Sequence, residues 1–182
     1  MVHPDFEAAS RPWQTGRPFE VYIDASDLAW CVVLCQRPTV GGTPKIIGFV
    51  SRTFTDEATR WSAFEREFFA WKEGNAAVAK WTSGFTLFVF FDHKNIERAE
   101  SVLASRRASK KLINWIADTQ HLLQSNVRVW IDGKNNVLAD AGSRGGWQEA
   151  VAKQLVLPQG QIRDSVRRLF TCLLYTSPSP RD

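Results

Sequence analysis

The stretch from Glu20 to Gln36, EVYIDASDLAWCVVLCQ, decides how the rest of the sequence is interpreted. Two apolar runs with the composition of β-strands flank a polar group at residues 24–27. Side chains alternate along a strand, so Tyr22 and Asp24 share one face of the first run. An Asp within such a run is costly to desolvate unless something pairs with it. Asp24 is therefore either a turn residue that begins a hairpin or a carboxylate at the centre of a sheet that holds a metal ion.

The composition is that of one globular domain of about 140 residues with flanking segments. Of the 182 residues, 44% are hydrophobic, and the 8 Trp and 12 Phe belong mainly in a core, because large aromatic side chains bury the most area. The formal net charge of +4 permits a nucleic-acid partner without requiring one.

The 3 Cys residues give no sign of a disulfide or a zinc site. Cys31 and Cys35 lie on the same predicted strand, where their Cα atoms would be about 13 Å apart, too far for a disulfide. The spacing of Cys and His matches no zinc motif. No apolar run approaches the roughly 18 residues of a membrane span, and the N-terminus lacks a signal-peptide core. We therefore expect a reduced, intracellular protein with no membrane contact.

The order of the apolar runs predicts a mixed sheet covered by helices. The predicted strands are residues 19–25, 30–36, 45–51, 85–91 and 127–131. One predicted helix begins at Ser62, and three more cover residues 95–103, 109–124 and 136–143. Three sequential strands with short connections form an antiparallel meander. Crossovers through helices make the last two strands parallel to the first. The expected fold class is α/β, with a mixed five-stranded sheet and helices on both faces.

The first long helix begins at a capping box formed by Ser62 and Glu65. Phe68 and Trp71 follow at helical spacing and should face the core. Glu67 lies on or beside the same stripe, whereas Glu65 is committed to the cap. The helix dipole also favours acidic residues in a first turn. Glu67 is therefore either a functional carboxylate or a residue at the margin of an amphipathic face.

Further acidic residues should converge on Asp24. The run FTLFVFF at 85–91 is typical of a strand buried on both faces, and it ends at Asp92. An acid at the carboxyl end of a central strand lies where α/β sheets place ligands. In the expected topology Asp24 and Asp92 are neighbours, and Glu67 and Asp140, on the last short helix, can approach the same point.

Four converging carboxylates raise one another's pKa unless cations intervene. Oxygen ligands suit Mg²⁺ or Mn²⁺, and two such ions about 3.5–4 Å apart can position the attacking and leaving oxygens of a phosphoryl displacement. The acidic residues therefore indicate a two-metal phosphodiester hydrolase that needs no Ser or Cys nucleophile.

Four segments, in the family's order, resemble the RNase H domain of reverse transcriptase from gypsy-type LTR retrotransposons. They are YIDAS at 22–26, the segments SRTFT and WSAFEREFFA between 51 and 70, FDHK at 91–94 and NNVLADAGSR at 135–144. Each segment alone is a weak signal, and all four in order are a strong one. The similarity covers roughly residues 18–144.

The resemblance implies an RNase H-like fold and hydrolysis of the RNA strand of RNA–DNA hybrids with two Mg²⁺ (or Mn²⁺) ions. The family's catalytic and metal-binding acids correspond to Asp24, Glu67, Asp92 and Asp140. Glu67 rather than Glu65 corresponds, because the family's acid is followed three residues later by a small residue, here Ala70. That assignment agrees with the capping argument.

The resemblance also implies two partners, an RNA–DNA hybrid and an upstream reverse transcriptase polymerase domain. The hybrid would be recognised by 2′-hydroxyls across its minor groove rather than by base sequence. The expected location is the cytoplasm, a virus-like particle or the nucleus. The candidate nucleic-acid contacts are Ser26, Arg106, Arg107, Lys110 and Lys111. A basic run of this kind is usually a solvated helix face, and phosphate contact is the alternative.

The sequence departs from the family pattern at four positions. Ala29 and Cys31 stand where Gly is usual, Phe91 where Thr or Ser is usual, and Gly142 where Leu is usual. None of these removes a candidate metal ligand, but a catalytically decayed module that binds nucleic acid or a polymerase domain remains the alternative. Another enzyme of the same fold, such as a transposase or resolvase, would carry an essential acid late in the chain, whereas Glu67 directly follows the third strand.

The expected domain boundaries leave a short segment at each end. Residues 1–18 would be a lead-in from an upstream polymerase or connection region, 19–145 the RNase H-like domain, and 146–171 a linker or partial helix. Residues 172–182, CLLYTSPSPRD, resemble a translated sequencing adapter and are excluded from fold reasoning. On this interpretation the natural chain continues past Thr171.

Overall fold

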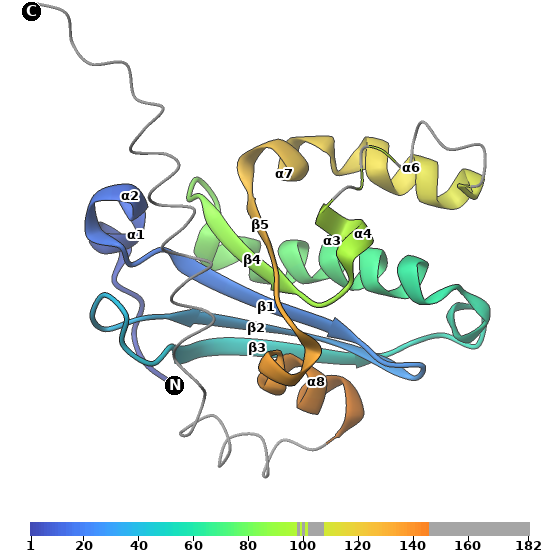
Figure 1. Ribbon diagram of the computed structural model, residues 1–182, viewed down its shortest axis with the longest axis horizontal. Coiled ribbons are helices and arrows are strands. Elements are labelled where there is room, and N and C mark those ends of the chain that lie inside the picture. The colour runs from blue at the N-terminus through green and yellow to red at the C-terminus, as the bar shows by residue number, and fades with distance from the viewer. Residues whose placement is uncertain (98, 100, 102–107, 146–182) are drawn as a thin grey trace, which may run out of the picture.

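The computed structural model describes residues 1–97, 99, 101 and 108–145. At its centre is a five-stranded sheet in the order β3-β2-β1-β4-β5 (Figure 1). The strands are β1 (Phe19–Ala25), β2 (Ala29–Gln36), β3 (Lys45–Thr53), β4 (Leu87–Phe91) and β5 (Val127–Trp130). β1, β2 and β3 are antiparallel neighbours, and β4 pairs in parallel with both β1 and β5. The predicted α/β fold with a mixed five-stranded sheet is confirmed.

Helices cover both faces of this sheet (Figure 1). They are α3 (Ala63–Thr82), α4 (Lys94–Glu97), α6 (Lys110–Asp118), α7 (Gln120–Ser125) and α8 (Val137–Arg144), with short 3₁₀ turns η1 (Ala58–Arg60) and η2 (Gly133–Asn135). The first core packs Val21 and Val89 of the sheet against Phe68 and Trp71 of α3. The second core contains Tyr22 and packs against α8. Alternate side chains of β1 therefore pack into two cores, one on each face of the sheet.

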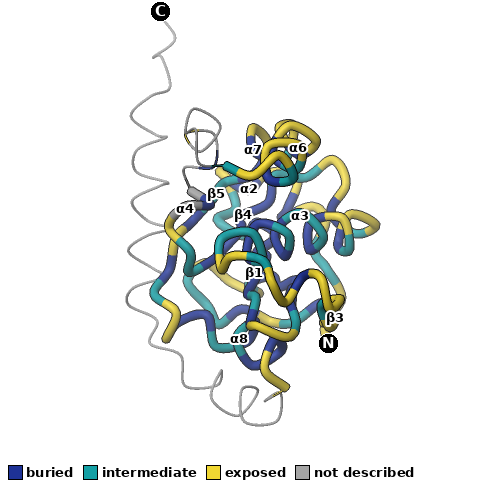
Figure 2. The backbone as a smooth tube through the Cα atoms, turned by 90° about the vertical axis from the view of Figure 1, so that its right-hand side faces the viewer, coloured by how far each residue is buried: buried dark blue, intermediate teal, exposed yellow. Residues whose placement is uncertain are grey.

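Burial follows this layering. Figure 2 shows the buried backbone concentrated in the central strands, with exposed segments in the outer helices and loops. All five residues of β4 are buried, which explains the unbroken apolar run in its sequence. Cys31 and Cys35 lie on the same strand, β2, as predicted, and both are buried. None of the helices within the described ranges is both long enough and apolar enough to cross a membrane.

Several predicted boundaries need correction. The predicted helix 109–124 is two helices, because the Thr119 hydroxyl donates to the Trp115 carbonyl over 2.7 Å at the point where α6 ends. The predicted strand 85–91 begins only at Leu87, since the Phe85 amide still closes a turn at the end of α3 by donating to Thr82. Of the predicted helix 95–103, α4 covers the beginning, and residues 98, 100 and 102–107 lie outside the described residues.

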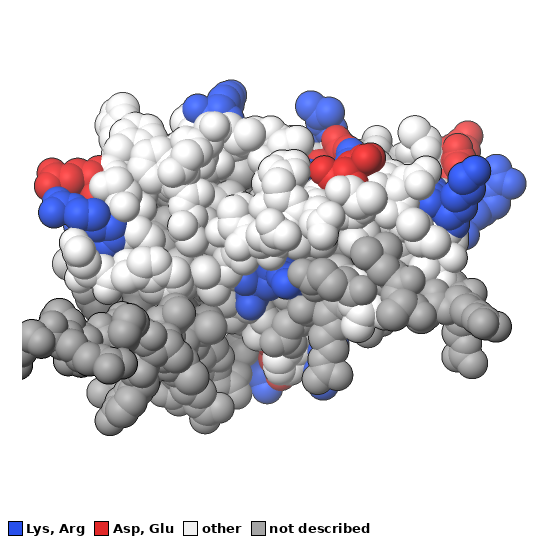
Figure 3. Space-filling model, turned by 90° about the horizontal axis from the view of Figure 1, so that it is seen from above, with Lys and Arg blue, Asp and Glu red and all other residues white. Residues whose placement is uncertain are grey.

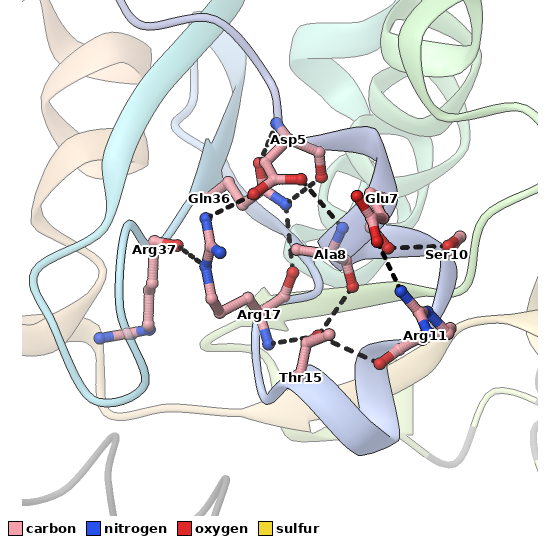
Figure 4. Close-up of polar contacts among 9 residues, drawn as sticks. All are labelled: Asp5, Glu7, Ala8, Ser10, Arg11, Thr15, Arg17, Gln36 and Arg37. Atoms are coloured by element: carbon pink, nitrogen blue, oxygen red, sulfur yellow. Dashed lines mark hydrogen bonds and ion pairs between the residues drawn. The ribbon is translucent and has the colours of Figure 1, made fainter.

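The N-terminal segment forms two short helices, α1 (Phe6–Ser10) and α2 (Pro12–Thr15), beside the end of the sheet where β1 begins (Figure 1). Figure 4 shows how Gln36 holds it: the side chain accepts from the Asp5 amide over 2.7 Å and donates to the Asp5 and Arg17 carbonyls. Arg17 also pairs with Asp5 at 2.9 Å. The segment thus packs onto the domain. Its origin in an upstream region, and the segments at 146–171 and 172–182, stay predictions outside what the structure describes.

Candidate active site

Asp24 and Asp92 lie at the C-terminal ends of adjacent parallel strands. The register of β1 and β4 pairs Tyr22 with Phe90, so the two acids, each two residues further along, lie on the same side of the sheet. Asp24 is buried, with 3% of its surface exposed, whereas Asp92 is half-buried. The parallel crossover that follows from the chain order thus brings together residues far apart in sequence.

Glu67 reaches the same point from the first turns of α3. The Ser62 hydroxyl accepts from the Glu65 amide, and the Glu65 carboxylate accepts from the Ser62 amide, so the predicted capping box is present. This cap fixes where the helix begins and turns Glu67, at 7% exposure, inward. Its carboxylate sits beside the end of β1, where the Ala25 amide donates to it.

Oxygen atoms of Asp24, Glu67 and Asp92 all lie within 4.8 Å of one another. The three predicted carboxylates therefore form one cluster, which we call the acidic cluster. Burial is the main influence on the pKa of each of the three acids, and the charges of Arg144, His93 and Arg66 oppose it only in part. The arrangement is that of a cation site rather than of a set of internal ion pairs.

The electrostatics of the acidic cluster disfavour three negative charges. Burial raises the pKa of Asp24 to about 6, and the charge of Asp92 adds to the increase. Burial, followed by the charges of Asp24 and Asp92, raises the pKa of Glu67 well above its ordinary value. Burial also raises the pKa of Asp92. A positive ion among these oxygens would reverse all three effects.

The second carboxylate oxygen of Glu67, Oε2, is buried and receives no hydrogen bond from any described residue. Buried polar atoms without a partner are uncommon, because each one loses its hydration without compensation. In a cluster made only of carboxylate oxygens, the partner that suits this atom is a hard cation such as Mg²⁺ or Mn²⁺.

Asp140 lies at the rim of the acidic cluster rather than inside it. Its carboxylate accepts from Arg144 over 2.6 Å, one turn further along α8, and its side chain is 46% exposed. Its charge still contributes to the raised pKa of Asp24 and Asp92, so it faces the same region. The structure thus brings three of the four predicted acids together and places the fourth beside them.

Two serine hydroxyls join α8 to β1. Ser143 donates to the Asp24 carboxylate, and Ser26 donates to the Ser143 carbonyl over 2.8 Å. Ser26 also accepts from the Leu28 and Ala29 amides in the turn after β1, and it is buried. These bonds fix the turn after β1, and the contact of Ser26 with nucleic acid stays a prediction.

Asn136 makes a third link between the two elements. It is fully buried before the first turn of α8, and its amide donates to the Ile23 carbonyl over 2.7 Å. Neither Ser143 nor Asn136 is a candidate from sequence reasoning. Both lie in the segment NNVLADAGSR, whose resemblance to the family directed attention to Asp140 alone.

Gly133 of η2 packs directly against Asp92. A Cβ atom at this position would lie 2.9 Å from the Asp92 carboxylate oxygen Oδ2. Such a distance is too short for a contact between a methyl group and an oxygen, so only glycine leaves the carboxylate where it is. His93, next to Asp92, stacks on Phe64 with ring centroids 5.3 Å apart. Burial lowers the pKa of this imidazole, which fits a packing role.

The predicted basic contacts divide into three groups. Arg106 and Arg107 lie outside the described residues. Lys111 pairs with Glu65 at 3.4 Å and lies over the Trp61 ring at 4.0 Å, so it holds α6 against α3. Lys110 is exposed. The described part of the surface in Figure 3 carries separate basic and acidic groups among uncharged atoms, and no continuous basic face.

Residues 14–122 match the family model of an RNase H-like domain found in reverse transcriptase. The matched range contains the three residues of the acidic cluster and ends before Asp140. Comparison with the curated proteins found no match.

Solved structures share the fold at low identity. RNase H1 of the archaeon Halobacterium salinarum is 18% identical with a TM-score of 0.53, and the alignment covers 72% of this chain and 98% of that one. The N-terminal RNase H domain of a Mycobacterium tuberculosis protein is 13% identical with a TM-score of 0.53, covering 74% and 96%. The protease–reverse transcriptase of a foamy virus is 15% identical with a TM-score of 0.51, covering 64% of this chain and 24% of the viral one. At such identities the likeness shows the fold alone.

Proposed function

Because the chain belongs to the family of RNase H-like domains found in reverse transcriptases, we propose that it is a divalent-metal-dependent endoribonuclease that hydrolyses the RNA strand of RNA–DNA hybrids. We assign it to the polyprotein of a gypsy-type LTR retrotransposon, where it would follow the polymerase domain and act inside the cell. The observation that carries the proposal is the acidic cluster, whose oxygen atoms lie within 4.8 Å of one another.

The residues of the acidic cluster fit a divalent cation. All the donors are carboxylate oxygens, one of them buried without a hydrogen-bond partner among the described residues. Burial and the neighbouring carboxylates raise the pKa of each acid, and a bound cation would favour the ionised forms, which supports the proposal. We propose that Asp24, Glu67 and Asp92, with Asp140 as a fourth ligand, hold two Mg²⁺ or Mn²⁺ ions.

Bound divalent ions would supply an activated water and stabilise the leaving oxygen of a phosphodiester. The protein's own contribution is to fix the carboxylates before substrate arrives. Ser143 holds Asp24, the cap of α3 orients Glu67, and the absence of a side chain at Gly133 leaves room for the Asp92 carboxylate. Asp24 and Glu67 are buried, whereas Asp92 and Asp140 are part-exposed. A phosphate group would therefore approach from the side of Asp92 and Asp140.

Selectivity for the hybrid would come from its shape and its 2′-hydroxyls. The side chain of Lys110 is exposed near the start of α6 and suits a backbone phosphate. Arg106 and Arg107 are candidates for the same contact from their sequence alone. Lys111 contributes less to this contact because its ammonium is already held by Glu65 and Trp61. Replacing Lys110 by Gln should weaken binding at low salt more than replacing Lys111, and equal effects would contradict this ranking.

The experiment that tests the proposal is cleavage of a hybrid labelled on both strands, in Mg²⁺ or Mn²⁺, by the wild-type protein and Asp92→Asn. We expect the wild-type protein to cut only the RNA strand. No cutting is expected in EDTA or by Asp92→Asn. Asp118→Asn, an exposed acid of α6, is the matched control and should cut normally.

Failure of the folded wild-type protein to cut, alone and with the upstream polymerase domain supplied, would overturn the nuclease assignment. Binding without cutting would then support the catalytically decayed module. Cutting restored by the polymerase domain would support the nuclease and show that the hybrid is held by both domains.

A further inference from the structure

Trp130 lies at the edge of the sheet beside the acidic cluster. It is the last residue of β5, and it pairs in register with Phe91, the residue before Asp92. Its indole N–H donates to the Asp92 carbonyl over 2.8 Å, while 37% of the residue stays exposed. A large aromatic ring on the surface is therefore fixed relative to one of the candidate metal-binding carboxylates.

Lys94 adds a positive charge to the same surface. It is the first residue of α4, which lies beside β5 (Figure 1). Its ammonium nitrogen lies 4.8 Å from the centroid of the Trp130 ring, and its side chain is exposed. A cation over an indole face is attracted by the negative potential of the ring. We call this pair the Trp130–Lys94 surface.

An exposed aromatic ring beside an ammonium group has the chemistry of a nucleotide contact. The ammonium suits a phosphate, and the ring presents an apolar area to a sugar or a base. In an RNA–DNA hybrid the bases are paired and stacked, so sugars and phosphates are the parts that a side chain at this surface would reach.

We propose that the Trp130–Lys94 surface binds the sugar–phosphate backbone of the hybrid beside the phosphate that is cut. This inference rests on the proposed function and adds a substrate contact to it. The hydrogen bond between Trp130 and Asp92 places this surface beside the acidic cluster, because Asp92 both contacts the ring and belongs to the cluster. A nucleotide backbone bound at the acidic cluster continues over this part of the sheet edge.

Fluorescence anisotropy in EDTA measures binding of the hybrid while cleavage is prevented, and so tests this contact. Trp130→Ala should weaken binding about five- to tenfold, whereas Trp130→Phe, which keeps a ring, should weaken it less than about twofold. Lys94→Gln should reduce the slope of log affinity against log salt by about 1. Trp13→Ala is the matched control: Trp13 is 42% exposed in α2, at the opposite end of β1 from the acidic cluster, and its loss should not alter binding.

Three results would overturn the proposal. The first is a Trp130→Ala protein that binds the hybrid like wild type, and the second is a Trp130→Phe protein that loses as much affinity as Trp130→Ala. The third is a Trp130→Ala protein whose affinity for single-stranded RNA falls as much as its affinity for the hybrid. The second would show that Trp130 acts only by holding Asp92, and the third that it stacks on unpaired bases. Melting temperatures of both variants verify folding. A wild-type protein that neither binds nor cuts the hybrid would refute the proposed function itself, whereas a wild type that cuts with an unaffected Trp130→Ala would refute this contact alone.

Discussion

The hydroxyl of Ser143 donates a hydrogen bond to the carboxylate of Asp24, a residue 119 positions earlier in the chain. This bond favours the ionised form of Asp24 against the burial that raises its pKa. It also joins α8, which carries Asp140, to β1. A single buried serine thus links the geometry of the two ends of the candidate site.

Ser143→Ala should weaken divalent-cation binding several-fold and lower the free energy of unfolding by about 1 kcal/mol, because Asp24 loses a buried donor. Calorimetric titration with Mn²⁺ and urea unfolding measure the two effects. Ser125→Ala, which removes an exposed hydroxyl at the end of α7, is the control. Equal cation affinity in the two variants would show that Ser143 does not position Asp24.

Gly133→Ala should impair cleavage strongly while leaving stability nearly unchanged. The added Cβ would lie 2.9 Å from the Asp92 carboxylate and displace it, but it meets no core residue. Gly48→Ala provides a matched control, because its Cβ would meet the Trp81 ring at an ordinary 3.5 Å. Cleavage rates at saturating Mg²⁺ and melting temperatures decide the matter. A Gly133→Ala protein that cuts at the wild-type rate would contradict the placement of η2 against the site.

The stability of the metal-free protein should fall as pH rises through about 6. Burial raises the pKa of Asp24 from 3.8 to about 6, so between these values the folded protein holds a proton that the unfolded chain has released. Its stabilising effect is complete below about pH 4 and is lost as pH rises through the folded pKa.

Asp24→Asn removes this ionisation. In EDTA it should raise the free energy of unfolding by about 2 kcal/mol at pH 7.5 and change it little at pH 4, although it abolishes cleavage. Urea unfolding at both pH values tests this, with Asp118→Asn as an exposed control. An Asp24→Asn protein that is less stable than wild type at pH 7.5 would contradict this account, because it would mean that the ionised Asp24 carboxylate stabilises the fold.

A second buried charge supports the fold rather than the site. Glu20, 2% exposed, pairs with Arg37 at 2.5 Å and accepts from the Tyr22 hydroxyl at 2.7 Å. Arg37→Met should therefore cost about 3 kcal/mol, since it leaves a buried carboxylate without its cation. Arg11→Met, which breaks an exposed pair with Glu7, should change stability little. Urea unfolding of the two variants compares them, and equal losses would contradict the burial of Glu20.

The features that the sequence predicted correctly depend on short-range patterns. Apolar alternation gave β1 its observed bounds, and the capping box separated Glu65 from Glu67 before any contact was known. The meeting of Asp24 with Asp92 followed from one long-range rule, the parallel crossover between strands joined through helices. Three of the four proposed acids could be brought together in this way.

The features that could not be predicted from the sequence depend on side-chain contacts. Gln36 fastens the N-terminal helices through Asp5, 31 positions away, and nothing in a polar lead-in signals that partner. A basic run does not reveal that Lys111 lies over the Trp61 ring, and its contact with nucleic acid stays a prediction. Thr119 ends α6 through a side-chain bond to the backbone, which competes with helix propensity in a way the apolar stripe does not show.

The central claim is that Glu67, not Glu65, joins Asp24 and Asp92 in one cation site. Calorimetric titration of Mn²⁺ into the metal-free protein, with Glu67→Gln and Glu65→Gln compared, tests it most directly. Gln also serves in a capping box, so Glu65→Gln keeps the start of α3 and should bind Mn²⁺ like wild type. Glu67→Gln should lose at least tenfold in affinity, as expected when one of the four proposed carboxylate ligands is neutralised. Unchanged affinity in Glu67→Gln, or an equal loss in both variants, would contradict the claim.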